Sequence, residues 1–260
     1  MILSCPYWRS ILLALALPLA GQAQTSPTAP RRSREGLNLP TRARPVFHFG
    51  LSGALNGARV RLTDPSSPAP AIGFRAGYAA GVAGNWARGH WALQAGARYS
   101  RHGYIQREQF VLAPGTPPVT ATAEYRLNYL AVPVSVAYTQ FANGQGVQVS
   151  AGVYVARFLA GQYERSDLAP GRPNVVGRVR AADAQTLSFG GAEYVRPWDA
   201  GLQAGVGYRY GQLLVQAGYA HGLRSLAPAL TSRGSALTAV PYYNQTLSLS
   251  LTYFVFGPRD

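Results

Sequence analysis

The side chains that could carry chemistry in this chain are histidines, serines and a few charged residues within otherwise apolar segments. A serine nucleophile needs a histidine base within hydrogen-bond reach, and no pair other than His221 and Ser225 stands out. These two cannot meet within one strand, because four residues of extended chain span about 13 Å. The other histidines, His48, His90 and His102, show no spacing typical of metal ligands. The sequence therefore predicts no catalytic residues, no metal site and no cofactor.

Three charged residues form a more informative set, namely Arg75, Arg98 and Asp199. Each lies in a segment of strand-like alternation, on the face opposite the apolar side chains. If these segments form a narrow barrel, a charge inside it is costly unless it is paired. We therefore expect an Arg–Asp ion-pair cluster that plugs the extracellular half of the lumen. Structural ion pairing is its favoured meaning, with gating or ligand capture as the alternative.

These residues would be positioned by segments that alternate apolar with small or polar residues, the period of a β-strand. Each segment reaches the roughly 9–11 residues that a tilted membrane strand needs. The gaps between them alternate long and short, as in a barrel with long extracellular loops and short periplasmic turns. This pattern predicts an all-β, eight-stranded antiparallel up-and-down transmembrane β-barrel. The segments are 46–56, 72–86, 90–101, 125–139, 146–159, 198–209, 212–223 and 243–256. It stays open whether residues 181–195 extend the fifth and sixth of them.

Aromatic residues fall at both ends of the apolar faces, which is typical of the girdles at the two interfaces of a membrane barrel. The opposite faces carry mainly Gly, Ala and Ser, which suits a tight lumen better than a solvated exterior. The predicted girdle consists of Phe47, Trp86, Trp91, Tyr99, Tyr138, Tyr208, Tyr219, Tyr243 and Tyr253.

The N-terminus resembles a secretory signal peptide. Arg9 precedes the apolar run 11–20, and a small-x-small cleavage site ends at Ala23. We expect a signal peptide at 1–23 that directs export through the Sec route, a disordered basic periplasmic tail at 24–45 and a barrel domain at 46–256. Cleavage near Ala23 would remove Cys5, the single cysteine. The formal charge of +14 comes from scattered arginines rather than a dense run, so nucleic acid is not an expected partner.

Four short motifs resemble the PorT-like outer-membrane β-barrel proteins, which are often labelled a porin family. They are 129–134 (YLAVPV), 199–208 (DAGLQAGVGY), 212–226 (QLLVQAGYAHGLRSL) and the final LSLTYF run. Ala131 departs from the family pattern, because many members carry an acidic residue there. The resemblance implies an integral outer-membrane barrel and, for some members, a link to type IX secretion. It implies no agreed biochemical activity.

We therefore expect a non-enzymatic barrel in the outer membrane, with outer-membrane lipids and envelope or secretion-complex proteins as partners. Two alternatives stay open, a narrow channel and a lipid-modifying enzyme. Arg126 and Arg157, near the extracellular ends of their strands, either reach toward lipid phosphates or are solvated loop bases. The sequence does not indicate which loop residues matter, which ligand binds or how many copies assemble.

Overall fold

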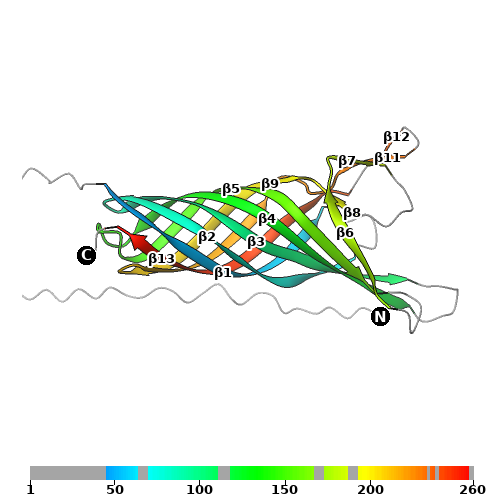
Figure 1. The fold of residues 1–260 in the computed structure, drawn as a ribbon, viewed down its shortest axis with the longest axis horizontal. Coiled ribbons are helices and arrows are strands. Elements are labelled where there is room, and N and C mark those ends of the chain that lie inside the picture. The colour runs from blue at the N-terminus through cyan, green and yellow to red at the C-terminus, as the bar shows by residue number, and fades with distance from the viewer. Residues whose placement is uncertain are drawn as a thin grey trace, which may run out of the picture. The chain divides into compact units, whose positions relative to one another are not determined.

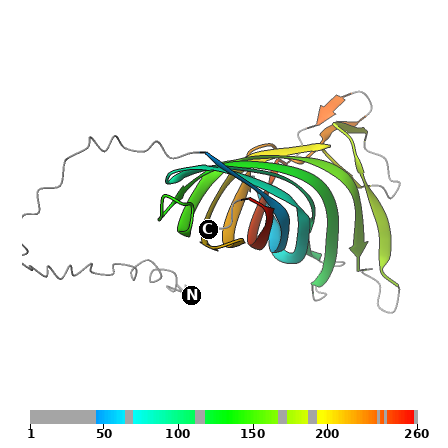
Figure 2. The same ribbon diagram turned by 60° about the vertical axis from the view of Figure 1, so that its left-hand side comes forward.

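Eight long strands close into one antiparallel ring (Figures 1 and 2). They are β1 (Val46–Leu62), β2 (Ala71–Arg88), β3 (Trp91–Phe110), β4 (Val119–Thr139), β5 (Gly146–Arg165), β9 (Trp198–Tyr210), β10 (Leu213–Gly222) and β13 (Tyr242–Phe256). Each strand pairs with the next in this order, and β13 pairs with β1 to close the ring. The eight-stranded antiparallel barrel predicted from the alternation is thereby confirmed.

The computed structural model describes residues 45–63, 70–110, 118–166, 173–186, 193–232, 235–237 and 240–257. The predicted signal peptide, 1–23, and all but the last residue of the predicted tail, 24–45, lie outside these described residues. Both therefore stay predictions.

The two ends of the barrel differ in how the strands are connected. Val46 of β1 and Phe256 of β13 lie at one end, which also holds the connections 89–90, 140–145 and 211–212. We call this the turn end, and the opposite end, with the longer connections, the loop end. Gly89 and Gly211 have φ angles of 60° and 55°, which glycine adopts without strain in a two-residue hairpin turn. The short gaps of the sequence are therefore confirmed as tight turns.

Side chains alternate along each strand between the outside and the lumen. On β5, Val147, Val149, Val153 and Val155 are exposed on the outer face. The intervening lumen-facing positions hold small or polar residues such as Gly152, where an added Cβ would lie 2.0 Å from the carbonyl oxygen of Val134. Inward small residues therefore let the strands approach closely, as the sequence predicted.

Strands at the loop end are longer than the sequence indicated. β3 continues to Phe110, β4 begins at Val119 and β5 continues to Arg165, so much of the expected loops 102–124 and 160–197 is strand. The expectation was wrong because it followed the apolar outer face. From position 101 on, the outer face of β3 mixes polar and charged residues such as Arg101, Arg107 and Gln109 with Gly103 and Ile105, while the hydrogen-bonded ladder continues.

Short strands fill the rest of the loop end. β6 (Val175–Ala181) pairs antiparallel with β5, and β8 (Glu193–Val195) pairs parallel with β6. Segment 181–195 therefore does not simply prolong β9, because residues 193–195 run parallel to β6 and residues 184–186 pair with β11. A separate three-stranded sheet joins β7 (Ala184–Thr186), β11 (Ala229–Ser232) and β12 (Ser235–Leu237). We call the extended parts of β3, β4 and β5 together with β6 and β8 the upper sheet.

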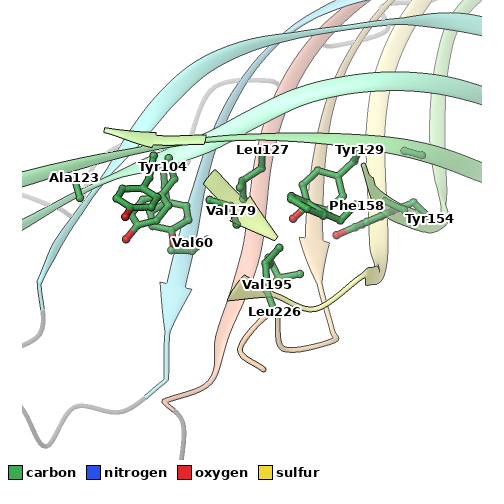
Figure 3. Close-up of a cluster of buried hydrophobic side chains, with 14 residues drawn as sticks. Val60, Tyr104, Ala123, Leu127, Tyr129, Tyr154, Phe158, Val179, Val195 and Leu226 are labelled. Carbon is green, nitrogen blue, oxygen red and sulfur yellow. The ribbon is translucent and has the colours of Figure 1, made fainter. Parts of the chain in front are cut away.

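The lumen at the loop end is packed with aromatic and aliphatic side chains (Figure 3). Tyr104 stacks on Tyr125 with ring centroids 4.5 Å apart. Tyr129 meets Phe158 edge-on at 5.6 Å and stacks on His102 at 5.0 Å. Such aromatic pairs contribute about 0.5–1.5 kcal/mol each beyond the area that they bury. This loop-end core comprises Val60, Tyr104, Ala123, Tyr125, Leu127, Tyr129, Ala131, Tyr154, Ala156, Phe158, Tyr163, Val179, Val195 and Leu226.

Candidate functional site

The middle of the lumen is polar and holds a cavity of about 120 Å³. Its walls are joined across the barrel by hydrogen bonds. Gln203 donates to Ser135 Oγ at 2.6 Å, and Gln216 donates to Ser150 Oγ at 2.7 Å. A water molecule occupies roughly 10–15 Å³ on a comparable measure, so several waters fit. The cavity is suited to water or a small ion rather than to an organic substrate.

The predicted ion-pair cluster is not formed. Arg75 pairs instead with Glu124, whose Oε1 accepts from Arg75 Nε at 2.6 Å. Arg98 does line the central cavity, as expected for an inward position. Among the described residues, which include all three predicted members, no ion pair joins Asp199 to Arg75 or Arg98. The alternation along the strands predicted that Arg98 and Asp199 point inward, but it did not predict the groups that they contact.

Asp199 is held by neutral groups instead. Its side chain is only 1% exposed, and its Oδ2 accepts from Tyr154 Oη at 3.0 Å and from Asn244 Nδ2 at 3.3 Å. Tyr154 lies one strand away on β5, and Asn244 is near the start of β13. These two donors supply part of the hydrogen bonding that a buried carboxyl group needs. Asp199 therefore fastens β5 and β13 to β9 beneath the loop-end core.

A serine–histidine contact occurs where the sequence suggested none. Ser100 Oγ lies 2.9 Å from His102 Nδ1, and both residues are buried on the lumen face of β3. Residues two apart on a strand share a face, so the spacing of Ser100 and His102 in the sequence is the signal that could have indicated this contact. No acidic side chain among the described residues bonds His102, so the third member of a catalytic triad is missing from this pair. His221 makes contacts of 3.4 Å with Tyr219 and Gln245 instead.

The turn end of the lumen is also closed by side chains. His48 and Phe254 are buried there, with ring centroids 5.6 Å apart. The guanidinium carbon of Arg209 lies 4.8 Å from the Phe254 ring centroid, and its Nε donates to the Gly211 carbonyl at 3.2 Å. This cation–π contact places the Arg209 charge against the face of an aromatic ring. The polar cavity therefore lies between an aromatic core at the loop end and this smaller group at the turn end.

The outer face of the upper sheet carries charged residues. Glu124 accepts from both Arg75 and Arg126, and Arg126 lies 3.5 Å from Glu164. The hydrogen bond from Arg75 is the main cause of a lowered pKa at Glu124, with a smaller contribution from Arg126. Asn174, the residue just before β6, donates to Glu164 at 2.9 Å and so joins this network.

A groove of about 610 Å³ lies over β3, β4, β5 and β6 beside this network. Its lining includes the basic side chains Arg101, Arg126, Arg178 and Arg180. Its exposed apolar wall comes from Leu159, Ala160 and Ala181, and the buried residues Phe158 and Val179 also line it. Clustered arginines bind oxyanions, because a guanidinium matches the geometry of phosphate or sulfate oxygens.

Aromatic side chains lie on the outer face at both ends of the apolar band. Trp91 and Tyr138 are paired across β3 and β4 and meet edge-on at 5.2 Å, near the turn end. Phe47 and Trp86 are paired across β1 and β2 at the same end. Tyr243 differs from the prediction in being half-buried. The exposed members of the predicted girdle are Phe47, Trp86, Trp91, Tyr99, Tyr138, Tyr208, Tyr219 and Tyr253.

The outward residues form a band of membrane size. On β4 the exposed apolar residues run from Leu130 to Tyr138. Eight steps of about 3.4 Å on a strand tilted by roughly 40° span about 20 Å along the barrel axis. A membrane barrel carries an outward apolar band of about 25 Å between aromatic girdles.

Comparison with known proteins agrees with this architecture. The family model for the outer membrane protein beta-barrel domain matches residues 22–227. The chain belongs to the outer membrane protein beta-barrel domain family. As a member of this family it is an outer-membrane β-barrel protein. No curated protein sequence matches it.

Several solved barrels are similar to this outer-membrane protein. Ail, the attachment invasion locus protein of Yersinia pestis, in complex with the heparin analogue sucrose octasulfate, has 9% identity and a TM-score of 0.38, over 80% of this chain and 97% of Ail. The outer membrane protein OprG from Pseudomonas aeruginosa has 10% identity and a TM-score of 0.35, over 84% and 98%. The translocator domain of the autotransporter NalP from Neisseria meningitidis has 8% identity and a TM-score of 0.25, over 79% and 88%.

The described residues contain no group of three or more His, Cys, Asp or Glu side chains that could hold a metal ion. Within the same residues, no helix has the length and apolar character needed to cross a membrane.

Proposed function

We propose that this outer-membrane barrel is a non-enzymatic interaction protein that contacts its partners through the upper sheet. The observation that carries the proposal is the construction of the loop end. β3, β4 and β5 continue past the apolar band as a hydrogen-bonded sheet, and β6 and β8 widen it. A pore or an anchor needs no such extension. A rigid sheet outside the membrane offers a preformed surface, which lowers the entropic cost of binding.

The outer face of this sheet is chemically mixed. Val176, which is 69% exposed, is in register with Glu164 and lies next to the network of Arg126, Glu164 and Asn174. Exposed aliphatic residues beside charged groups are typical of a protein contact surface. Partners of the upper sheet would be envelope proteins or surface molecules. A secretion-associated role, which the PorT-like motifs imply, falls within this class of function.

The narrow-channel alternative is less well supported. A channel needs continuous water, whereas the aromatic rings of Tyr129 and Phe158 meet in the lumen at the loop end. Phe254 and Arg209 lie close together at the turn end. An eight-stranded barrel has an interior that side chains just fill. These contacts favour a lumen that does not conduct.

The lipid-modifying alternative would need an accessible nucleophile and base. The Ser100–His102 pair has the required distance of 2.9 Å, but it is buried in the lumen. A lipid reaches a barrel from its outer face or rim. The position of this pair therefore favours a structural hydrogen bond over catalysis.

The proposal is tested by photo-crosslinking in intact cells that express the full chain. A photoreactive amino acid replaces Val176 on the upper sheet, and matched controls carry it at Leu249, on the outer apolar band, and at Ser250, in the lumen. We expect a protein adduct of defined mass from position 176 alone. Absence of an adduct at position 176, together with stepwise single-channel conductance of the purified barrel, would overturn the proposal in favour of the channel.

A further inference from the structure

The basic groove lies on the outer face of the upper sheet, as the strand register shows. Arg126 of β4, Gln162 of β5 and Arg178 of β6 form one row across three neighbouring strands. Arg101 of β3 pairs with Asn128, which pairs in turn with Ala160. Side chains in register on one face of a sheet are direct neighbours. The groove is thus assembled from strands rather than from a loop.

The charge of the groove is largely uncompensated. Arg126 pairs with Glu124 and Glu164. Arg101, Arg178 and Arg180 make no ion pair with the acidic residues in the part of the chain that the structure describes. Cationic groups gathered around one groove repel each other and favour an anion between them.

The level of the groove indicates which anion it meets. Tyr99, Leu130 and Arg157 form a row in register at the loop-end border of the outer apolar band, and Arg157 pairs with Trp198. The Arg157 guanidinium lies 5.7 Å from the Trp198 ring centroid. Arg101 is two residues beyond Tyr99, which is about 7 Å along a strand. The groove therefore begins where the hydrocarbon-facing surface ends, at the depth of lipid headgroups.

The groove also has the mixed lining that a lipid headgroup requires. Leu159 is half-exposed beside the arginines, and Ala160 and Ala181 continue the apolar wall. A soluble inorganic anion gains nothing from such a wall, whereas a phosphorylated lipid places its acyl chains against the apolar surface below.

We propose that Arg101, Arg126, Arg178 and Arg180 form a binding site for the phosphate groups of an anionic lipid in the outer leaflet of the membrane. The inference rests on the proposed function in one respect, because it places the loop end outside the cell. Arg126 bonds acidic neighbours and also lines the groove. Of the two alternatives for this residue, lipid phosphate contact or a solvated loop base, the proposal therefore favours lipid phosphate contact. A guanidinium binds phosphate through paired N–H donors, so glutamine at these positions should weaken the site more than lysine.

The test uses the full chain, purified in a zwitterionic detergent and analysed by native mass spectrometry. The probes are bis-phosphorylated lipid A, lipid A without its phosphates, inorganic phosphate and a sulfated oligosaccharide. The variant R178Q/R180Q removes two groove charges. The matched control R61Q/R107Q removes two other exposed charges, on β1 and β3. The variant R178K/R180K keeps the charge, and a shift in gel mobility on boiling confirms that each variant is folded.

We expect one bis-phosphorylated lipid A per barrel, bound about tenfold or more tightly than the dephosphorylated lipid. The dephosphorylated lipid binds more weakly because it lacks two charge-assisted contacts with the arginines. R178Q/R180Q should lose about this factor, R178K/R180K less, and R61Q/R107Q should bind like the wild type. Equal binding of dephosphorylated lipid A, or unchanged binding by R178Q/R180Q, would overturn the proposal. Displacement of lipid A by millimolar inorganic phosphate would show a free-phosphate site, and displacement by the sulfated oligosaccharide would show a glycan site; either overturns lipid binding. Failure of the crosslink at position 176 with lipid binding intact would remove the proposed function alone.

Discussion

The two tyrosines at the base of the loop-end core predict opposite effects of the same substitution. Tyr154 donates its hydroxyl hydrogen to Asp199 at 3.0 Å, whereas the Tyr129 hydroxyl is buried and has no hydrogen-bond partner among the described residues. Both rings lie in the same core (Figure 3). Replacing tyrosine by phenylalanine removes one oxygen in each case. The difference between the two variants therefore isolates the hydrogen bond.

The expected magnitudes follow from the surroundings of each hydroxyl group. Y154F leaves a buried carboxyl group with one donor fewer, which should lower the free energy of unfolding by about 1.5–3 kcal/mol. Y129F removes a buried polar atom that pairs with nothing and keeps the ring contacts with His102 and Phe158. It should leave the free energy of unfolding unchanged or raise it by up to about 1 kcal/mol.

Reversible urea unfolding of the barrel in lipid vesicles, followed by tryptophan fluorescence, measures both values. Y208F is the control, because this tyrosine is exposed on the outer face near the turn end. The free energy of unfolding of Y154F should lie below that of Y129F by about 1.5 kcal/mol or more. A destabilisation by Y129F equal to that by Y154F would show that the Tyr129 hydroxyl is hydrogen-bonded, and it would refute this reasoning about the core.

Three further predictions concern packing, pH and conduction. G152V should prevent folding or cost several kcal/mol in urea unfolding, because an added Cβ meets backbone at 2.0 Å, whereas G53A should be nearly neutral, with nothing within 4 Å. The hydrogen bond from Arg75 lowers the folded-state pKa of Glu124 below 4.5, so this pair should stabilise the barrel at neutral pH. The stabilisation should be lost as the pH falls through the lowered pKa, and E124Q should abolish this pH-dependent loss. F254A opens the turn end but leaves the loop-end core, so single-channel recordings in planar bilayers should stay flat; stepwise currents would contradict the closed loop end.

The strands could be predicted from the sequence because membrane and lumen impose different residues on alternating positions. Val147 to Val155 on β5 show the rule directly, with valines outward and small or polar residues inward. The rule depends on the contrast between the two faces. Past Arg101 and Arg126 the outer face meets water, the contrast disappears, and the strand ends were placed too early. Where both faces of a strand carry a similar mixture of residues, the alternation in a single sequence does not show where the strand ends.

The charged partners could not be predicted for a geometric reason. Inward direction follows from the alternation, which placed Arg98 and Asp199 correctly, but partner choice depends on the relative height of neighbouring strands. Asp199 lies opposite Ala156 in register, and its hydroxyl donor comes from Tyr154, two residues before Ala156 on β5. Arg75 lies next to a register shift between Phe74 and Tyr78. A β-bulge of this kind changes the direction in which a side chain points, and no residue type in this segment predicts the bulge.

The change in the outer face at the loop end connects the membrane boundary to the candidate surface. Tyr99 ends the apolar face of β3, and the next outward residue on this strand is Arg101. The lumen face changes at nearly the same level in the opposite sense, from the polar cavity to the loop-end core of Tyr104 and its neighbours. Apolar residues thus move from the outside to the inside where the lipid ends, as in a soluble β-protein. The upper sheet therefore has its own hydrophobic core, and this is why it can remain ordered outside the membrane and present a fixed row of charges.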